Sequence, residues 1–177
     1  MKLFVLIAIF ASVLPLARSD CPEDTAMFFQ TLPEGPVTQL VNGVNVTNGA
    51  IFLNKGVSQL GHVDTQWHPT ATDPIILTFP RTVNSAEVEL VACGIRGEGA
   101  FVEAYNAQDE LISTKSYAGD GCGRMSSSLY DTLSFKLAFN EPDTTSLRIY
   151  YKLNSTPCHT IGQCNYGVVV RSVNYHC

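Results

Sequence analysis

Short runs in which apolar and polar residues alternate follow one another along most of this chain. In Ala86–Ala92 every second residue is apolar, and Glu87 and Glu89 lie between the apolar positions. The same period of two recurs in Leu133–Phe139 and in Leu147–Tyr151. Because successive side chains of a strand point to opposite faces, this alternation predicts β-strands with one face buried.

Further runs rich in β-branched and aromatic residues are bounded by Gly, Asn, Asp or Pro, which favour turns. They predict additional strands at Val37–Thr47, Ala50–Leu53, Pro74–Phe79, Ala100–Tyr105, Glu110–Ser116 and Tyr166–Tyr175. The polar residues Asn106–Asp109 separate two of these runs, so we expect a β-hairpin there. The last run is rich in valine, and we expect it to be covered partly on both faces.

The spacing of these strands predicts the fold class. About nine or ten strands, separated by turn residues roughly every 8–12 positions, are typical of an antiparallel β-sandwich or jelly roll. A parallel sheet would need crossover helices. The sequence suggests only a single helical turn, at Cys21–Gln30, where Pro22 and Glu23 suit a helix N-terminus. We therefore predict an all-β, antiparallel β-sandwich of the jelly-roll type, with disulfides, that forms one domain over residues 20–177.

The first residues differ from the rest of the chain. Fourteen of the 19 residues of Met1–Ser19 are apolar, Lys2 lies near the start, and small residues (Ala17 and Ser19) precede Asp20. This pattern predicts a signal peptide that is cleaved before Asp20. A retained N-terminal anchor is the alternative, but the apolar run is shorter than the roughly 20 residues that span a bilayer. We expect the mature protein to be secreted and extracellular, with no membrane span.

Composition and charge narrow the range of partners. Of the 177 residues, 45% are apolar and 15% are charged, as in a chain that folds around a core. Loss of Lys2 and Arg18 with the leader takes the formal net charge from −5 to −7. Nucleic acids and anionic membranes are bound by clustered Lys and Arg. The acidic mature chain therefore argues against both of these partners.

All six cysteines follow the predicted leader, and an even number in an exported chain predicts three disulfides. They are Cys21, Cys93, Cys122, Cys158, Cys164 and Cys177. Many pairings are open. Proximity favours a bond between the fourth and fifth cysteines; the first and last could tie the termini together, which would leave Cys93 with Cys122. A zinc site is the alternative, but the sequence has no Cys-x-x-Cys pair to support it.

Two Asn-x-Thr triplets begin at Asn45 and Asn154. In a secreted eukaryotic chain both are candidate N-glycosylation sites, because neither has Pro at its middle position. The alternative is that either triplet is a plain polar turn.

The order of several short motifs resembles that of a known family. A Val-Asn-Gly-Val-Asn-Val run is followed by a strand ending in Thr-Phe-Pro, another strand, a hairpin and a further strand. In this order the motifs are Val41–Val46, Thr78–Pro80, Val88–Ala92, Val102–Ala107 and Ser146–Ile149. This order resembles secreted β-sandwich modules of the galactose-binding-domain-like type. The resemblance implies a jelly-roll sandwich whose loops at one end bind glycans or other ligands, in some members with a structural calcium ion, and it does not imply catalysis. It matches strand and turn positions alone, so no ligand residue is carried over to this chain.

The richest cluster of polar and aromatic residues is His62–Pro69, which holds the one tryptophan of the sequence. In a glycan-binding loop Trp67 would stack on the apolar face of a sugar while Asp64 or His68 bonded its hydroxyl groups. The alternative is that Trp67 fills the core, as a lone tryptophan usually does in a small sandwich. Metal binding by His62, Asp64 and His68 is a third option, although the spacing fits no strong motif. The candidate ligand-binding residues are therefore Asp64, Trp67 and His68.

A glycine-rich loop and a pair of glutamates are weaker candidates. The loop Ala118–Arg124 holds Asp120 and three glycines, which could wrap a calcium ion or form a plain turn pinned by Cys122. No other cofactor is indicated. Glu87 and Glu89 lie on one face of a strand, roughly 7 Å apart, a separation that a glycosidase could use. The outward face of an alternating strand is normally just solvated.

Together these patterns favour a secreted, non-catalytic binding module whose partner is an extracellular glycan or a cell-surface ligand. The first alternative is a structural or interaction protein of an extracellular matrix or coat, presenting the sandwich surface to other proteins. A glycan hydrolase is the remaining alternative, and the sequence has neither a Gly-x-Ser-x-Gly nor a His-Glu-x-x-His motif.

Overall fold

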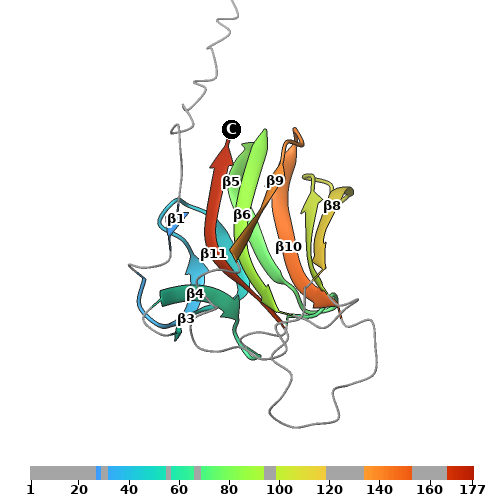
Figure 1. Ribbon diagram of the computed structural model, residues 1–177. Helices are drawn as coiled ribbons and strands as arrows, with labels where there is room; N and C mark the ends of the chain where they lie inside the picture. The colour runs from blue at the N-terminus through green and yellow to red at the C-terminus, as the bar shows by residue number, and fades with distance from the viewer. Residues whose placement is uncertain are drawn as a thin grey trace, which may run out of the picture.

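The computed structural model describes residues 27–28, 32–54, 57–65, 69–93, 99–118, 134–152 and 167–177. Within these ranges the chain forms strands, turns and bends, and no helix (Figure 1). Among the described residues, no helix has the length and apolar character needed to cross a membrane. Of the segment Cys21–Gln30, in which a helical turn is expected, the structure describes only Met27–Phe28, which form a strand, so the turn stays a prediction.

Eleven strands follow one another along the described chain. They are β1 (Met27–Phe28), β2 (Gly35–Gln39), β3 (Asn45–Asn54), β4 (Val57–His62), β5 (Ile75–Val83), β6 (Ser85–Cys93), β7 (Gly99–Tyr105), β8 (Leu111–Ala118), β9 (Ser134–Phe139), β10 (Thr144–Lys152) and β11 (Gly167–His176). Every pair of neighbouring strands is antiparallel. The all-β, antiparallel class expected from the alternating pattern is therefore confirmed.

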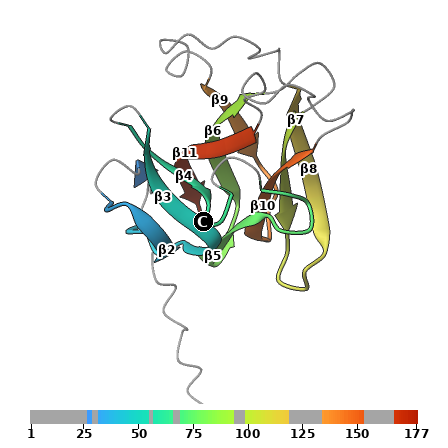
Figure 2. The ribbon, with the colours of Figure 1, turned by 90° about the horizontal axis from the view of Figure 1, so that it is seen from below.

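The strands form one hydrogen-bonded path in the order β8-β7-β10-β5-β3-β4-β11-β6-β9, with β2 beside β3 and β1 beside β11. The path folds back on itself, so that β6 and β11 pack against β7 and β10 in a sandwich (Figure 2). The first layer is β8-β7-β10-β5-β3, and the second is β4-β11-β6-β9. Because β3 pairs with both β5 and β4, it carries the hydrogen bonding from one layer to the other.

Side chains connect the two ends of this path, where β8 of the first layer meets β9 of the second. The ring of Tyr117 on β8 stacks on that of Phe135 on β9, with centroids 3.8 Å apart and planes 16° apart. Lys115 Nζ donates a hydrogen bond to the carbonyl oxygen of Ala138 and lies 5.3 Å from the centroid of the Phe139 ring. A lysine on an edge strand that bonds its neighbour's carbonyl also hinders the addition of a foreign strand.

The core lies between the layers and is built from the apolar positions that alternate along each strand. Its largest fully buried side chains come from β3, β4, β5, β6, β9 and β10, and they include Ile51, Leu60, Leu77, Leu90, Phe139, Leu147 and Ile149. The alternation predicted for β6, β9 and β10 is confirmed by these positions. The valine-rich strand β11 is buried on both faces near its start, since Val169 and Val170 are 2% and 0% exposed.

Two predicted strands differ from the structure. The strand expected at Val37–Thr47 is divided into β2 and β3 by a turn in which Leu40 N–H donates to the carbonyl of Val44, at 2.8 Å. Gly43 in that turn has a φ of 84°, which a side chain would strain. Strand β4 is absent from the predicted set, because Ser58, Gln59 and Gly61 interrupt its apolar character.

Several expectations concern residues outside the described ranges. The signal peptide, Cys21, Cys122, Cys158, Cys164, Asn154 and Asp120 all lie there, as does the side chain of Cys93. Cys177 is disulfide-bonded. The pairing of the six cysteines and the calcium loop stay predictions.

Candidate functional site

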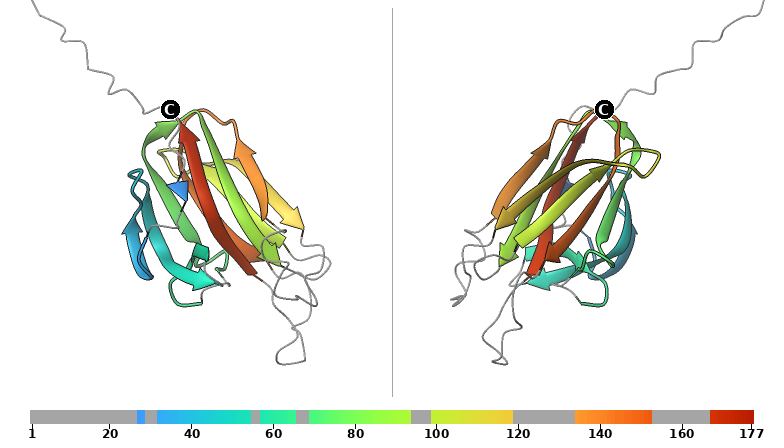
Figure 3. Two further views of the ribbon diagram at one scale, coloured as in Figure 1. Left: turned by 60° about the vertical axis from the view of Figure 1, so that its left-hand side comes forward. Right: turned by 90° about the vertical axis from the view of Figure 1, so that its right-hand side faces the viewer.

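The outer face of the first layer carries aromatic and charged side chains where β7 and β10 lie side by side. Inward positions of both strands are apolar and buried, so the residues between them point outward. These outward residues are Phe101, Glu103 and Tyr105 on β7, and Arg148, Tyr150 and Lys152 on β10. We call this surface the β7–β10 face; Figure 3 (right) views the side of the molecule on which β7 and β8 lie.

Two aromatic rings of this face lie parallel. Phe101 and Tyr150 are direct cross-strand partners. Their ring centroids are 5.4 Å apart and their planes differ by 7°. Phe101 is half-exposed whereas Tyr150 is 9% exposed, so the phenylalanine ring is the outer member of the pair. Lys152 Nζ lies 6.0 Å from the centroid of the Phe101 ring, near the limit for attraction between a cation and a ring.

One carboxylate holds two tyrosines of the β7–β10 face in place. Glu103 Oε1 accepts a hydrogen bond from the Tyr150 hydroxyl at 2.8 Å, and Oε2 accepts one from the Tyr105 hydroxyl at 2.7 Å. Burial, together with the hydrogen bond and negative charge of Glu103, raises the pKa of Tyr150 to about 12. The same causes, burial first, raise the pKa of Tyr105. Both hydroxyls therefore keep their protons at neutral pH and direct them toward Glu103.

Arg148 joins the sheet to the turn of the β7–β8 hairpin. Its guanidinium carbon lies 4.0 Å from the centroid of the Tyr105 ring, and Nη2 forms an ion pair with Asp109 Oδ1. Asp109 has a φ of 61°, and Asn106 Oδ1 secures its turn by accepting hydrogen bonds from the backbone N–H groups of Gln108 and Glu110. Arg148 Nε is buried and forms no hydrogen bond among the described residues. The hairpin predicted at this turn is confirmed.

This arrangement offers three kinds of contact to a ligand. The Phe101 ring presents an apolar surface. The hydroxyl oxygens of Tyr105 and Tyr150 donate to Glu103 and keep a lone pair with which to accept. Arg148 holds further N–H donors. An apolar plane with donors and acceptors at its edge suits a ligand that is itself apolar on one face and polar at its rim.

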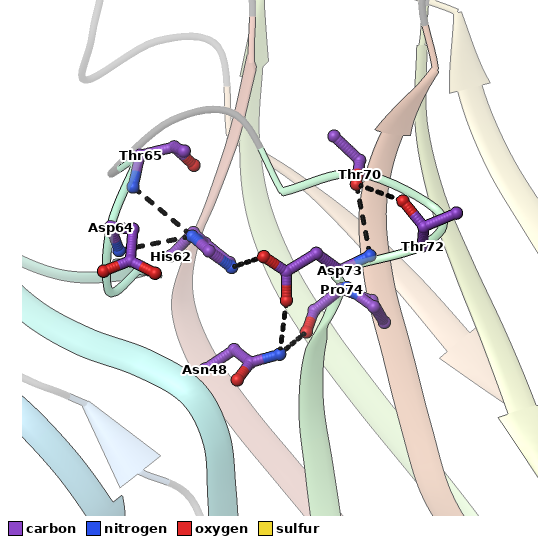
Figure 4. A network of polar contacts seen from close by, with 8 residues as sticks. All are labelled: Asn48, His62, Asp64, Thr65, Thr70, Thr72, Asp73 and Pro74. Carbon is purple, nitrogen blue, oxygen red and sulfur yellow. Dashed lines mark hydrogen bonds and ion pairs between the residues drawn. The ribbon is translucent and has the colours of Figure 1, made fainter.

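A second polar cluster lies at the end of β4, around the buried side chain of His62 (Figure 4). His62 Nδ1 accepts hydrogen bonds from the backbone N–H groups of Asp64 and Thr65, both at 3.3 Å. Nδ1 therefore carries no proton, and the ring proton lies on Nε2, which is 3.1 Å from Asp73 Oδ2. The two atoms are within ion-pair distance, but Nε2 donates no hydrogen bond among the described residues. Asp73 Oδ1 accepts a hydrogen bond from Asn48 Nδ2 at 2.8 Å.

The cluster fixes both described ends of the segment that holds the predicted ligand residues. Asp64 is exposed in the turn that follows His62, and Asp73 begins the approach to β5. The carbonyl of Pro69 accepts a hydrogen bond from the backbone N–H of Tyr151 at 2.9 Å, which ties the segment to β10. Trp67 and His68 lie outside the described residues, so their roles as ligand-binding residues stay a prediction.

The two glutamates considered for catalysis lie on the outer face of the second layer, which we call the β6–β11 face. Glu87 Oε1 is 2.8 Å from Lys136 Nζ. Glu89 accepts a hydrogen bond from Ser172 at 3.3 Å and lies 4.0 Å from Arg171 Nη1. Each carboxylate is thus paired with a cation. Among the described residues, no group of three or more His, Cys, Asp or Glu side chains is placed to hold a metal ion.

The residues of the β7–β10 face are absent from the predicted site, although the sequence contains a signal for them. Outward positions of a half-buried strand are normally small or charged, whereas Phe101, Tyr105 and Tyr150 are aromatic residues at such positions. The alternating pattern of β7 and β10 shows each of these residues to be outward. It does not show that Phe101 and Tyr150 are partners, because that depends on the register between two distant strands.

The sequence matches no protein-family model and no curated protein sequence. Among solved structures, one match is a mutant of CBM29-2, a family 29 carbohydrate-binding module, complexed with cellulohexaose. Its TM-score is 0.41 and its sequence identity is 9%, and the match covers 86% of this chain and 90% of that chain. The CBM22-1 xylan-binding domain from Paenibacillus barcinonensis Xyn10C has a TM-score of 0.41 and 8% identity, covering 85% and 91%. The lectin-binding domain of lectinolysin complexed with Lewis b has a TM-score of 0.36 and 8% identity, covering 88% and 92%.

By name, these neighbours are two carbohydrate-binding modules and a lectin-binding domain. Their TM-scores lie below 0.5 and their sequence identities below 10%. Such a likeness assigns no ligand and no binding residue to this chain.

Proposed function

We propose that this chain is a secreted, non-catalytic module that binds an extracellular glycan through the β7–β10 face. One observation carries the proposal. The outward ring of Phe101 lies parallel to that of Tyr150, and Glu103 holds the hydroxyl groups of Tyr105 and Tyr150 in fixed directions beside these rings.

A sugar ring has the surface that this face complements. Its C–H groups form an apolar face that packs on an aromatic ring, and its hydroxyl groups donate and accept hydrogen bonds around the rim. Phe101 supplies the packing surface. Tyr105 and Tyr150 supply acceptors for sugar hydroxyls, and Arg148 supplies donors. Because both tyrosines are already fixed by Glu103, binding loses little side-chain freedom.

The rest of the sequence supports an extracellular setting for such a module. Met1–Ser19 has the pattern of a signal peptide, the six cysteines suit an oxidising compartment, and the formal charge of −7 without the leader disfavours anionic partners. We propose that the cysteines form three disulfides and that the termini are tied by a bond between Cys21 and Cys177.

The test compares glycan binding by purified mature protein, first on a glycan array and then by calorimetric titration of the best ligand. We expect Phe101→Ala to weaken binding about tenfold, which corresponds to ~1.4 kcal/mol, while Phe101→Tyr retains it because the ring remains. Lys136→Ala on the β6–β11 face is the matched control and should leave binding unchanged.

Two outcomes would contradict the proposal. Loss of binding in Trp67→Ala but not in Phe101→Ala would move the site to the loop of Asp64, Trp67 and His68. If no glycan binds and pull-down from secreted extract yields a protein partner, the chain is an interaction protein of a matrix or coat instead.

A further inference from the structure

The glycosylation triplet at Asn45 lies on the same outer face of the first layer as the β7–β10 face. Asn45 begins β3 and is exposed, as is Thr47 two residues later. Asn45 Oδ1 accepts a hydrogen bond from Gln39 Nε2 at 3.2 Å. Asn45 Nδ2, the atom that would bear a sugar, donates no hydrogen bond among the described residues.

The register of the sheet places Asn45 in one row with Tyr105. Asn45 pairs with Thr78 on β5, Thr78 pairs with Ser146 on β10, and Ser146 pairs with Tyr105 on β7. Directly paired residues of antiparallel strands share a face of the sheet, so all four point outward. Three strand spacings separate Asn45 from Tyr105, a distance of roughly 14 Å.

The surface between these two residues is uncharged and half-buried. It consists of Thr78, Ser146 and, in the adjacent row, Ile76, which lies between Thr47 and Arg148. An oligosaccharide, which is polar but has apolar patches, can lie on this surface without burying a charge.

We propose that Asn45 carries an N-linked glycan that lies along the outer face of β5 and β10 and shields the near side of the β7–β10 face. The glycan comes from a lipid-linked oligosaccharide pyrophosphate. A bond forms between Asn45 Nδ2 and the anomeric carbon of the first sugar, the bond from that carbon to the pyrophosphate oxygen breaks, and the amide nitrogen loses a proton. The expected effect of this glycan on ligand binding rests on the proposed function, in which the β7–β10 face is the ligand site. The attachment of the glycan to Asn45 does not depend on that function.

The experiment uses the full chain secreted from a eukaryotic host, with two variants of one residue. Thr47→Ala destroys the triplet while keeping Asn45, and Thr47→Ser changes the same side chain but keeps the triplet. Peptide mass spectrometry reports whether Asn45 is modified. Hydroxyl-radical footprinting then reports the exposure of Ile76 and Tyr105, with Phe135 and Leu137 on β9 as controls that lie away from this face.

We expect Asn45 to be modified in the wild type and in Thr47→Ser but not in Thr47→Ala. Oxidation of Ile76 and Tyr105 should rise at least twofold in Thr47→Ala, while Phe135 and Leu137 stay unchanged, and any ligand of the β7–β10 face should bind several-fold more tightly. An unmodified Asn45 in the secreted wild type would overturn the proposal. So would a modified Asn45 whose loss leaves the oxidation of Ile76 and Tyr105 unchanged. Failure to find a glycan partner would contradict the proposed function. It would not affect the test of the Asn45 glycan, because footprinting needs no ligand.

Discussion

The two outer faces of the sandwich follow the same alternation but use their outward positions differently. On the β6–β11 face, Glu87 lies against Lys136, and Glu89 lies against Ser172 and Arg171. On the β7–β10 face, the single glutamate, Glu103, bonds two tyrosine hydroxyls.

This difference separates an ordinary solvated face from a candidate binding face. Exposed pairs of opposite charge contribute little to stability and occur on many protein surfaces. On the β7–β10 face, a half-exposed aromatic ring lies beside tyrosines whose hydroxyl groups are held by part-buried hydrogen bonds to Glu103. The glutamates of β6 are therefore accounted for by their ion pairs, and Phe101 and its neighbours are the candidate binding residues.

His62→Ala is the substitution with the largest expected effect, and it can break the comparison. It removes a buried ring and leaves the backbone N–H groups of Asp64 and Thr65 without their acceptor, so the free energy of unfolding should fall by about 3 kcal/mol, as measured by urea denaturation. Glycan binding by the folded variant should persist. If binding disappears while the protein stays folded, the site is the 63–73 segment and not the β7–β10 face.

Glu103→Ala should have the next largest effect. It leaves the hydroxyl groups of Tyr105 and Tyr150 without an acceptor, which costs about 1–3 kcal/mol, and it should weaken glycan binding because the tyrosines lose their fixed directions. Glu89→Ala is the matched change on the β6–β11 face and should leave binding intact. Equal effects of the two substitutions on binding would remove the distinction between the faces.

Alkaline titration sharpens the comparison through tyrosine. The tyrosine of an unfolded chain loses its proton near pH 10, whereas folded Tyr150 keeps its proton up to a pKa of about 12. The folded state therefore binds more protons between these values, and stability falls as pH rises from 10 to 12. Ultraviolet difference absorbance should show late ionisation of Tyr150 and of Tyr105, whose pKa is also raised. Glu103→Gln should move the pKa of Tyr150 back toward 10, but not all the way, since burial is the larger cause.

The smallest effect is expected from Lys136→Ala. The hydrogen bond and charge of Glu87 raise the pKa of Lys136, so this pair stabilises the fold below the lysine's usual pKa and stops doing so as the lysine loses its proton at higher pH. Because the side chain is exposed, we expect no measurable shift of the urea midpoint at neutral pH. A clear loss of stability would show that the β6–β11 face does more than cover the core.

The sequence predicted those parts of the fold that depend on neighbouring residues. Period-two runs identified β6, β9 and β10, and the polar residues Asn106–Asp109 identified the hairpin turn. Strand β4 escaped prediction because Ser58, Gln59 and His62 are polar residues that the fold buries. Their burial depends on partners from distant segments, such as Asp73 for His62.

The candidate site depends even more on distant pairing. Phe101, Glu103 and Tyr105 are visible in the sequence as the outward residues of one strand. Their partners Arg148 and Tyr150 come from a strand more than 40 positions later, and the register that aligns them is a property of the assembled sheet. Local patterns show which way a side chain points, but they do not show what it meets.

The position of β11 has a consequence for how the chain folds during synthesis. Strands β4 and β6 are complete by Cys93, yet both pair with β11, which begins at Gly167. Until that strand leaves the ribosome, the facing edges of β4 and β6 have no partner between them, and exposed edges of this kind invite aggregation. We therefore expect the sandwich to complete its folding only after β11 has been synthesised.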